Sequence, residues 1–417
     1  MMKKTLALLS VLCLLLCSLP GAFAGNGEAP ALRLAVATDM HYLSPRLVEG
    51  GELIRQAAEN GDGKMMHLSE HITDAFFAGM KAAKPDALIL SGDLTLNGGT
   101  ASHEDFAAKL KELEQSGIKL LVIPGNHDID MEYAINYADT GAEKAPALSF
   151  EEFCSLYGDF GPDLALSRDE YTFSYTVQLA ERLRLIMLDT NSYGTGTIKS
   201  STLEWLEGQL KEAQAAGAEV ITVSHQNLYA HNRLLSFGYR LYNADKLLAL
   251  LEEYGVLCHL SGHIHSQSVY ESAVPEIVTS SLTVSPAQYG VLEYDGSSLE
   301  YRCVETDVAS WAADMGRGEP ELVDFAAYAR RFFADNCRRQ VGEMYEGTEM
   351  SEEDISALAE CFAALNQAYF AGEKPEHEAL LPGVELWRAQ EKNFTQMYIE
   401  TMYAVDKDSR SYVISLN

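Results

Sequence analysis

Positive charge is scarce in this 417-residue chain. Lysine and arginine together number 31, against 61 aspartate and glutamate residues, and the formal net charge is −30 at pH 7. Proteins that bind nucleic acids or anionic membrane surfaces carry a basic face, so we expect neither a nucleic acid polymer nor a membrane surface as a partner. The acidic excess says little about a local site, because bound metal cations can reverse the charge there.

Cysteine is sparse as well. The chain has seven cysteines, five of them after residue 24, and an odd number does not suggest a disulfide framework. Cys337 and Cys361 fall on neighbouring predicted helices and are the one pair that we consider for a disulfide in an oxidising compartment. Cys258 lies inside a predicted strand, so we expect no thiolate-ligated copper(I) or iron–sulfur site.

Only one long apolar run is present, and it lies close to the N-terminus. Lys3 and Lys4 precede it, and an Ala-Phe-Ala sequence follows it up to Ala24, which is the layout of a secretory signal peptide. We expect cleavage after Ala24 and a secreted or cell-surface protein. A lipoprotein anchored through Cys17 is the weaker alternative, because no small residue precedes that cysteine. No later run is long enough to span a bilayer.

Short apolar runs alternate with helical patterns from about residue 32 onwards. Such runs suit strands buried on both faces, and their alternation with helices predicts a largely parallel α/β sheet. The predicted strands are 32–38, 87–90, 119–123, 219–223 and 256–260, and the predicted helices are 69–84, 102–116 and 202–215.

A polar motif follows each predicted strand. Ligands bind at the carboxyl ends of parallel strands, so motifs that are distant in sequence can converge there. Singly, each motif has a structural explanation, such as a turn for a glycine–asparagine pair, but their joint occurrence at successive strand ends favours a common site. The motifs are Asp39-Met40-His41, Gly92-Asp93, Gly125-Asn126-His127-Asp128, His225 and Gly262-His263-Ile264-His265.

The residue types in these motifs indicate a metal centre. Carboxylate, imidazole and amide oxygen without thiolate suit Mn, Fe or Zn. The candidate ligands are Asp39, His41, Asp93, Asn126, His225, His263 and His265. They are too many for one ion and suit two ions that share a ligand. Such a pair holds the attacking and leaving oxygens of an in-line displacement at phosphorus and generates hydroxide near neutral pH.

The other histidines are mostly expected to have structural roles. His67 and His71 are four residues apart on a predicted helix, but no strand-end carboxylate accompanies them, so we favour packing or solvent exposure. His259 lies inside a predicted strand and is expected to be a hydrogen-bonded core residue. His231 and His377 are expected at the surface.

The motif series D-x-H, G-D, G-N-H-D, H and G-H-x-H resembles the calcineurin-like metallophosphoesterase superfamily in every element and in order, over about Leu32 to Val304. The phrases ATDMHYLSP, SGDLTLNGGTASHEDF and SGHIHSQS are similar to secreted bacterial class III cyclic-nucleotide phosphodiesterase-like proteins, which also carry a helical C-terminal extension. The resemblance implies a two-sheet β-sandwich flanked by helices, in the α/β class, and a metal-dependent phosphoric ester hydrolase.

The resemblance also implies a role for each ligand and for a bridging hydroxide, which would attack the phosphorus. The ligands would be Asp39, His41 and His265 for the first metal ion, Asn126, His225 and His263 for the second, and Asp93 for both.

Two further motif residues are implied to be catalytic. His127 would stand beside the scissile phosphate, where it would stabilise the developing charge or protonate the leaving oxygen, and Asp128 would orient its ring. One residue departs from the pattern, because many relatives have a second histidine where this chain has Gln226. The departure leaves the ligand set intact and puts a substrate contact by that second histidine in doubt.

Three regions are predicted, namely a signal peptide at 1–24, a catalytic domain at 25–304 and a helical C-terminal extension at 305–417. We favour a packing role for the extension, because amphipathic helices of this length usually bury against their own domain; a lid or a partner surface is the alternative. Late strands are expected at 276–286, 289–294 and 299–304, with a hairpin turn at Asp295-Gly296, and helices from Glu319 towards 341, from Ser351 to Gly372 and over 387–405.

We therefore expect a secreted phosphoesterase that acts on a small-molecule phosphate ester. The resemblance favours a phosphodiesterase of the cyclic-nucleotide type, and the alternative is a phosphomonoesterase acting on extracellular nucleotides or sugar phosphates. A non-catalytic, metal-containing surface-interaction protein is less expected, because metal binding alone does not need His127 and Asp128. Asn97, His103, loop 226–233 and the helical extension are expected near the substrate, but no pattern identifies the natural substrate, the metals or the oligomeric state.

Overall fold

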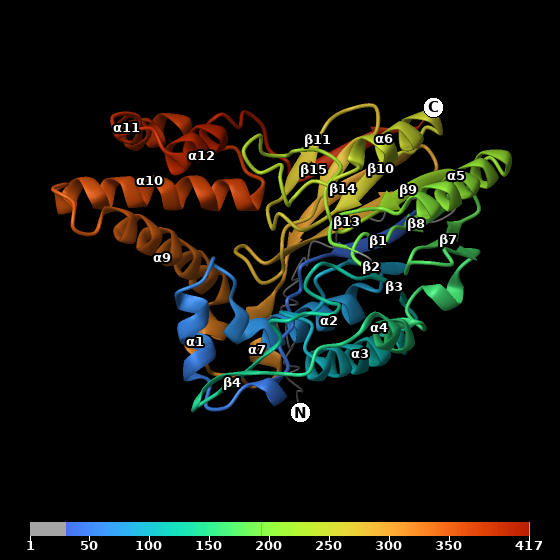
Figure 1. The fold of residues 1–417 in the computed structure, drawn as a ribbon, viewed down its shortest axis with the longest axis horizontal. Coiled ribbons are helices and arrows are strands. Elements are labelled where there is room, and N and C mark those ends of the chain that lie inside the picture. Colours follow the sequence, from blue (N-terminus) through green and yellow to red (C-terminus); the bar gives the residue numbers. More distant parts are fainter. Residues whose placement is uncertain (1–30, 193, 417) are drawn as a thin grey trace, which may run out of the picture. The chain divides into compact units, whose positions relative to one another are not determined.

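A computed structural model describes residues 31–416 except residue 193 (Figure 1). The predicted signal peptide, residues 1–24, lies outside the described residues. Strands from both ends of the described chain meet in a six-stranded sheet. In spatial order it contains β15 (Ser411–Ser415), β14 (Ser298–Glu305), β13 (Gln288–Tyr294), β1 (Leu32–Ala37), β2 (Ala87–Ser91) and β3 (Lys119–Ile123).

A seven-stranded sheet holds most of the remaining strands, and a separate hairpin is formed by β4 (Ile135–Ala138) and β5 (Gly141–Lys144). In spatial order the seven-stranded sheet contains β11 (Ser268–Tyr270), β12 (Glu276–Val278), β10 (Cys258–Ser261), β9 (Glu219–Val223), β8 (Leu183–Met187), β7 (Tyr175–Ala180) and β6 (Ser167–Arg168).

Both sheets are mixed, so the expectation of a largely parallel sheet is wrong. The parallel part of the first sheet is β1–β2–β3, and that of the second is β8–β9–β10–β12. Antiparallel strands extend both sheets at their sides. Hairpins explain the difference, because they join antiparallel strands without a helix. One is the predicted turn at Asp295-Gly296, where Asp295 Oδ1 accepts a hydrogen bond from Ser297 N at 2.7 Å.

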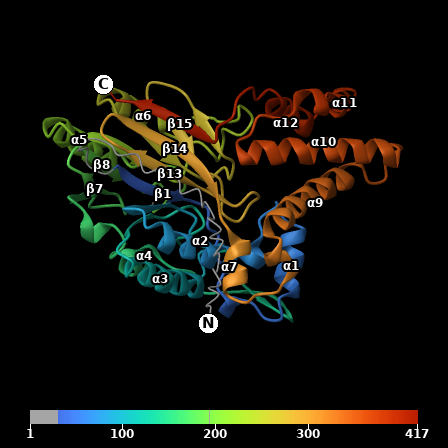
Figure 2. The same ribbon diagram turned by 180° about the vertical axis from the view of Figure 1, so that it is seen from behind.

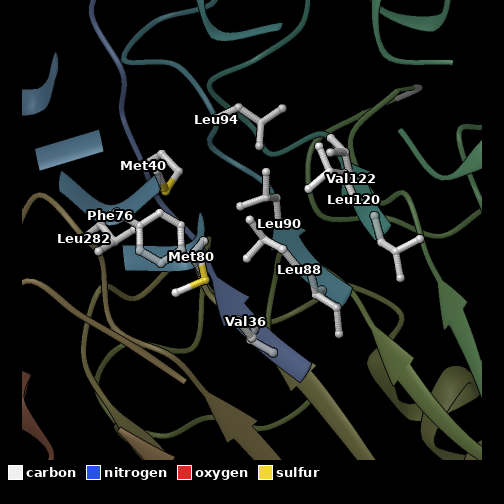
Figure 3. Packing of buried hydrophobic residues seen from close by; sticks show 14 of the residues in the cluster. Val36, Met40, Phe76, Met80, Leu88, Leu90, Leu94, Leu120, Val122 and Leu282 are labelled. Carbon is white, nitrogen blue, oxygen red and sulfur yellow. The ribbon is translucent and has the colours of Figure 1, made fainter. Parts of the chain in front are cut away.

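The two sheets pack face to face, as the expected sandwich does. One buried cluster contains Leu88 and Leu90 of the first sheet together with Leu185 and Val223 of the second. On the outer face of the first sheet, α2 (Ser69–Ala83) and α3 (Thr100–Glu114) add their apolar side chains to this cluster. Figure 3 shows Phe76 and Met80 of α2 in it. On the second sheet, α5 (Ser200–Ala215) and α6 (Ala244–Glu253) bury a separate cluster, and α5 lies beside β8 in both views (Figures 1 and 2).

Shorter helices lie in the connections between these layers. They are α1 (Glu52–Glu59), α4 (Phe150–Tyr157), α7 (Val308–Asp314) and α8 (Pro320–Val323), with 3-10 turns at Pro45–Leu47, Met66–Leu68 and Pro162–Leu164.

The C-terminal helices have a buried cluster of their own, centred on the fully buried Trp387. They are α9 (Phe325–Tyr345), α10 (Glu352–Ala371), α11 (His377–Arg388) and α12 (Phe394–Tyr403). As the sequence predicts, α10 begins where the Ser351 side chain accepts a hydrogen bond from Asp354 N and ends at Gly372 in the left-handed region.

Three features of the C-terminal region differ from the sequence-based expectation. The helix expected from Glu319 is two helices, α8 and α9, because the chain leaves helical geometry at Asp324, whose φ is −122°. The helix expected over 387–405 is two helices, because α11 ends at Arg388 and the Asn393 side chain caps a new helix at Phe394. The chain end is not helical, because β15 pairs with β14 of the first sheet. From Ala31 on, the described chain forms one compact unit, and a boundary at residues 304 and 305 stays a prediction.

Cys337 and Cys361 are both buried free thiols in the C-terminal helical cluster. The disulfide that we considered between them is therefore absent from the described structure. Among the described residues, no helix combines the length and the apolar character needed to cross a bilayer.

The end of α10 offers a test of how closely the C-terminal helices pack against the segment that contains Gln267. Replacing Gly372 with alanine is expected to lower the free energy of unfolding by about 1–3 kcal/mol. Its φ of 73° disfavours any side chain, and an added Cβ would lie 2.5 Å from Gln267 Cγ. Urea unfolding of the wild type and the variant measures the difference.

The matched control is Gly342→Ala in α9, where an added Cβ meets no atom within 4 Å. This change is expected to be neutral or to stabilise the protein by about 0.5–1 kcal/mol, because alanine favours the helix over glycine. Equal effects of the two substitutions would contradict the tight packing at Gly372.

Candidate metal centre

The predicted ligands follow the ends of five neighbouring strands. Asp39, Asp93 and Asn126 come after β1, β2 and β3 of the first sheet, whereas His225 and His263 come after β9 and β10 of the second. The parallel strands of both sheets therefore end at one edge of the sandwich, where the motif residues lie close together. Their role as metal ligands stays a prediction.

The first group of ligand atoms contains Asp39, His41, Asp93 and His265. The Nε2 atoms of His41 and His265 are 3.1 Å apart, and His265 Nε2 is 3.2 Å from Asp39 Oδ1. His41 Nε2 lies 3.9 Å from both Asp39 Oδ1 and Asp93 Oδ2. Four side chains from three motifs thus converge on one point.

The second group contains Asp93, His225 and His263, with Asn126 beside it. His225 Nε2 lies 3.3 Å from Asp93 Oδ1 and 3.1 Å from Asn126 Oδ1. The other ring nitrogen, Nδ1, donates to Ser91 O at 2.9 Å, which directs Nε2 at the group. Asp93 belongs to both groups and presents a different oxygen to each, an arrangement that allows it to be a shared ligand.

The donor set fits metal ions. Asp39 Oδ1, which faces the first group, is buried without a hydrogen-bond partner, and a buried unpaired polar atom is costly. Metal–ligand bonds of about 2.1 Å place neighbouring ligand atoms roughly 3–3.5 Å apart. The measured separations of 3.1–3.3 Å between several nitrogen and oxygen atoms match this spacing.

The electrostatics of the two groups also suit cations. Burial opposes ionisation of Asp39 and Asp93, yet the neighbouring histidines hold the pKa of both carboxyl groups well below the usual range. Burial likewise lowers the pKa of His225, but the charge of Asp93 outweighs it and raises that pKa to about 9. A cation that binds here replaces such a proton, so metal binding is expected to release protons.

The backbone is strained at the same residues. Asp39, His41, Asp93, His263 and His265 have φ values of 51°, 42°, 50°, 70° and 57°, in the left-handed region that disfavours side chains. They make up five of the eight non-glycine residues in this region among the described part of the chain. Strain of this kind persists where the surrounding structure enforces it, often at functional sites.

Glycines of three motifs allow the turns to approach one another. A Cβ at Gly92 would lie 2.9 Å from the backbone of Gly125, and one at Gly125 would collide with Asp93. A Cβ at Gly262 would lie 2.6 Å from Asp39 Oδ2. The glycines of these motifs therefore serve close packing of the ligand loops rather than flexibility.

His127 lies beside the groups, but Asp128 does not orient it, so that expectation is wrong. The ring of His127 is 5.2 Å from the ring of His41, and its Nδ1 is 3.0 Å from Asn97 Oδ1. Its backbone N–H donates to Asp93 Oδ1 at 2.8 Å. Asn97 therefore holds the imidazole, a role that adjacency in sequence cannot reveal.

Asp128 instead joins the loops after β2 and β3. Its carboxylate accepts hydrogen bonds from the backbone N–H groups of Gly125, Leu94 and Thr95 at 2.8–3.1 Å. Burial and the nearby charge of Asp93 raise the pKa of Asp128 to about 7. Its position makes it a structural brace for the loops that carry Asp93 and His127.

Two other histidines also differ from expectation. His103 is fully buried and contacts the Tyr157 hydroxyl at 2.8 Å, so it does not line a substrate entrance. His231 is not on the surface, because its Nε2 lies 3.0 Å from the buried carboxylate of Glu276. That carboxylate also accepts from the backbone N–H of Leu228, which anchors the loop after β9.

The remaining histidines behave largely as predicted. His259 is a hydrogen-bonded core residue, contacting the Thr222 and Ser224 hydroxyls at 2.8 Å. His67 contacts Tyr328 and His71 contacts Arg317, in packing roles away from the metal groups.

A cavity of about 620 Å³ opens onto the two groups. Motif residues form one part of its lining, namely Asp93, His127, His263 and His265. Asn232 also lines the cavity, from the loop 226–233 that was expected near the substrate. The helical extension, expected there only as a whole, contributes Tyr369, Phe370, Phe394 and Tyr398, whereas Asp62, Lys64 and Tyr239 were not identified from the sequence. Gln226 does not line the cavity, since its buried side chain bonds with Thr190 and Asn191 instead.

Two families match this chain. Residues 32–267 match the calcineurin-like phosphoesterase family, and residues 307–409 match the C-terminal domain of cyclic nucleotide phosphodiesterase. The solved structure of a dimetal phosphatase from Danio rerio is similar with a TM-score of 0.49 and 14% identity, over 67% of this chain and 97% of that one.

Curated relatives match over only part of their length. The glycerophosphodiester phosphodiesterase GpdQ of Enterobacter lignolyticus is 26% identical over 49% of this chain and 65% of its own length. A probable cyclic nucleotide phosphodiesterase of Synechococcus is 34% identical over 24% of this chain and 33% of its own length. The chain thus spans less than two thirds of each of these relatives.

The shared position of Asp93 predicts the metal content of its variants. The purified protein is expected to bind about two metal ions per chain, and His41→Ala about one. Asp93→Asn is expected to weaken both sites, because the two oxygens of Asp93 face different groups. Elemental analysis by mass spectrometry after gel filtration measures the ratio of metal to protein.

His377→Ala is the control, because this half-buried histidine contacts Tyr403 O and belongs to neither group. It is expected to retain the full metal content. Two ions retained by Asp93→Asn would contradict a shared ligand.

Proposed function

We propose that this protein is a secreted metal-dependent phosphodiesterase acting on a small-molecule phosphate ester. The proposal starts from the family, since the chain belongs to the calcineurin-like phosphoesterases. A cyclic nucleotide is the best substrate class. The observation that carries the proposal is Asp93, whose two oxygens face two ligand groups at the edge of a cavity that His127 also lines.

The metal centre would be binuclear, with Mn, Fe or Zn as the ions. Asp39, His41, His265 and Asp93 would hold one ion, and Asn126, His225, His263 and Asp93 the other. When bound, such ions supply a water of lowered pKa and a positive field for the phosphate oxygens.

The side chains around this centre would position the ester and its leaving group. Asn97 Oδ1 accepts from His127 Nδ1 and so leaves Nε2 free for the substrate. From Nε2, His127 would stabilise the developing charge or protonate the leaving oxygen. Lys64, paired with Asp62 at 2.5 Å and only 13% exposed, is the lone lysine or arginine among the described lining residues. It would attract the phosphate to the cavity.

Two features favour a diester over a monoester. A cavity of 620 Å³ has room for an organic group on either side of a phosphate. Residues 307–409 match a domain named for cyclic nucleotide phosphodiesterase, and the relatives described above are named as phosphodiesterases. A phosphomonoesterase acting on nucleotides or sugar phosphates is the alternative.

The first test compares bis-p-nitrophenyl phosphate with p-nitrophenyl phosphate, in Mn²⁺ and in chelator. We expect faster turnover of the diester, dependence on metal, and a loss of about 100-fold or more in kcat for His127→Ala, since general acid catalysis contributes at least this much. The metal content of His127→Ala is measured in parallel and should be unchanged.

The outcomes separate the alternatives. Preference for p-nitrophenyl phosphate would support the phosphomonoesterase. Two bound ions without turnover of either ester would argue for a non-catalytic, metal-containing interaction protein.

Asn97→Ala tests the orientation of His127. We expect kcat for the diester to fall roughly ten-fold with little change in KM, because substrate binding persists while the imidazole loses its hydrogen bond. Asn60→Ala, an exposed asparagine at the end of α1, is the control and should have wild-type kinetics. An unchanged kcat for Asn97→Ala would show that His127 does not depend on Asn97.

A further inference from the structure

We propose that helices α10 and α12 form the wall of this cavity that selects the substrate. This wall binds a planar aromatic ring in the organic group of the substrate. The inference rests on the proposed function and assigns its selectivity to the C-terminal helices. Four aromatic side chains carry it, called here the aromatic wall: Tyr369 and Phe370 of α10, and Phe394 and Tyr398 of α12.

The rings of the aromatic wall are arranged in succession. Phe394 and Tyr398, one helical turn apart, have nearly parallel rings with an interplanar angle of 9° and centroids 6.3 Å apart. Tyr369 meets Tyr398 edge to face at 6.1 Å. Phe394 is 54% exposed although it lines the cavity and stacks on Tyr398, so part of its ring is open to a ligand.

The wall continues toward the metal centre through Tyr239. The Tyr239 ring lies 5.6 Å from the ring of His263, and Tyr239 also lines the cavity. A ligand with its phosphate at His263 and Asp93 therefore has aromatic side chains beside its organic group. An aromatic ring gains from contact with such faces, whereas a glycerol group gains little from them and prefers hydrogen-bonding partners.

Hydrogen bonds from three residues outside the C-terminal helices hold the aromatic wall in place. Gln267, two residues after the candidate ligand His265, donates from its backbone N to Phe370 O at 3.0 Å. Gln288 Nε2 donates to Ala371 O at 3.1 Å, and Asn232 Nδ2 donates to Thr401 Oγ1 of α12 at 2.8 Å. The wall is therefore preformed, and a ligand need not order it on binding.

The test compares two ligands that differ only by a planar base. Titration calorimetry of the metal-loaded protein measures the Kd of adenosine 5′-monophosphate and of ribose 5-phosphate. We expect the nucleotide to bind about ten-fold tighter, because stacking of a base on an aromatic side chain is typically worth about this factor. In Phe394→Leu, which keeps apolar volume but loses the ring face, the ratio should fall toward one.

The control variant is Tyr171→Ala, which removes a 49% exposed ring at the turn between β6 and β7. It should retain the wild-type ratio, and unfolding curves of the variants confirm that each is folded. Equal affinities of the wild type for both ligands, or an unchanged ratio in Phe394→Leu, would overturn the aromatic wall.

Turnover of bis-p-nitrophenyl phosphate, measured on the same samples, separates this inference from the proposed function. Turnover without base preference would overturn the wall and leave the phosphodiesterase intact. Base preference without turnover of any ester would support the wall as a ligand site and overturn the phosphodiesterase.

Discussion

The site depends on the contacts that the carboxylate of Asp93 makes with the loops around it. One of its oxygens faces His225 and accepts the backbone N–H of His127, while the other faces His41. A single side chain after β2 thus joins loops from both sheets. Its position requires a left-handed backbone and the absence of a Cβ at Gly125. The motif Gly92-Asp93 and the motif that begins at Gly125 are consequently two halves of one packing arrangement.

The arrangement that forms the site also lowers the stability of the fold. Two buried carboxylates, several buried imidazoles and five strained backbone positions lie within one small volume. Bringing charges into a low-dielectric interior is costly unless partners compensate them. The rigid sandwich beneath, with both sheets in one buried cluster, holds these groups together. Cations that bind here supply the missing compensation, so metal binding and stability of the loops are coupled.

The sequence predicted what depends on local position. Motif residues lie directly after short buried strands, so their convergence follows from where those strands end. Side-chain direction does not follow, which is why Asp128 was assigned to His127 although it braces Gly125 and Thr95. Local position also does not predict which distant residues fold back onto the site. Phe394 and Tyr398 come more than a hundred residues after the last motif and carry no pattern other than helical periodicity.

The C-terminal helices were expected to act as a packing cap, with a lid or a partner surface as the alternative. In the structure, one short segment contacts both the ligand group and the C-terminal helices. His265 faces the first ligand group, and Gln267, two residues later, forms hydrogen bonds with Phe370 and Ser409. A displacement of α10 would therefore strain the loop that positions His265. In the proposed wall, Phe370 is therefore tied to the loop that carries His265. The wall that we propose would thus set selectivity for the organic group from segments joined to the loop that places the phosphate.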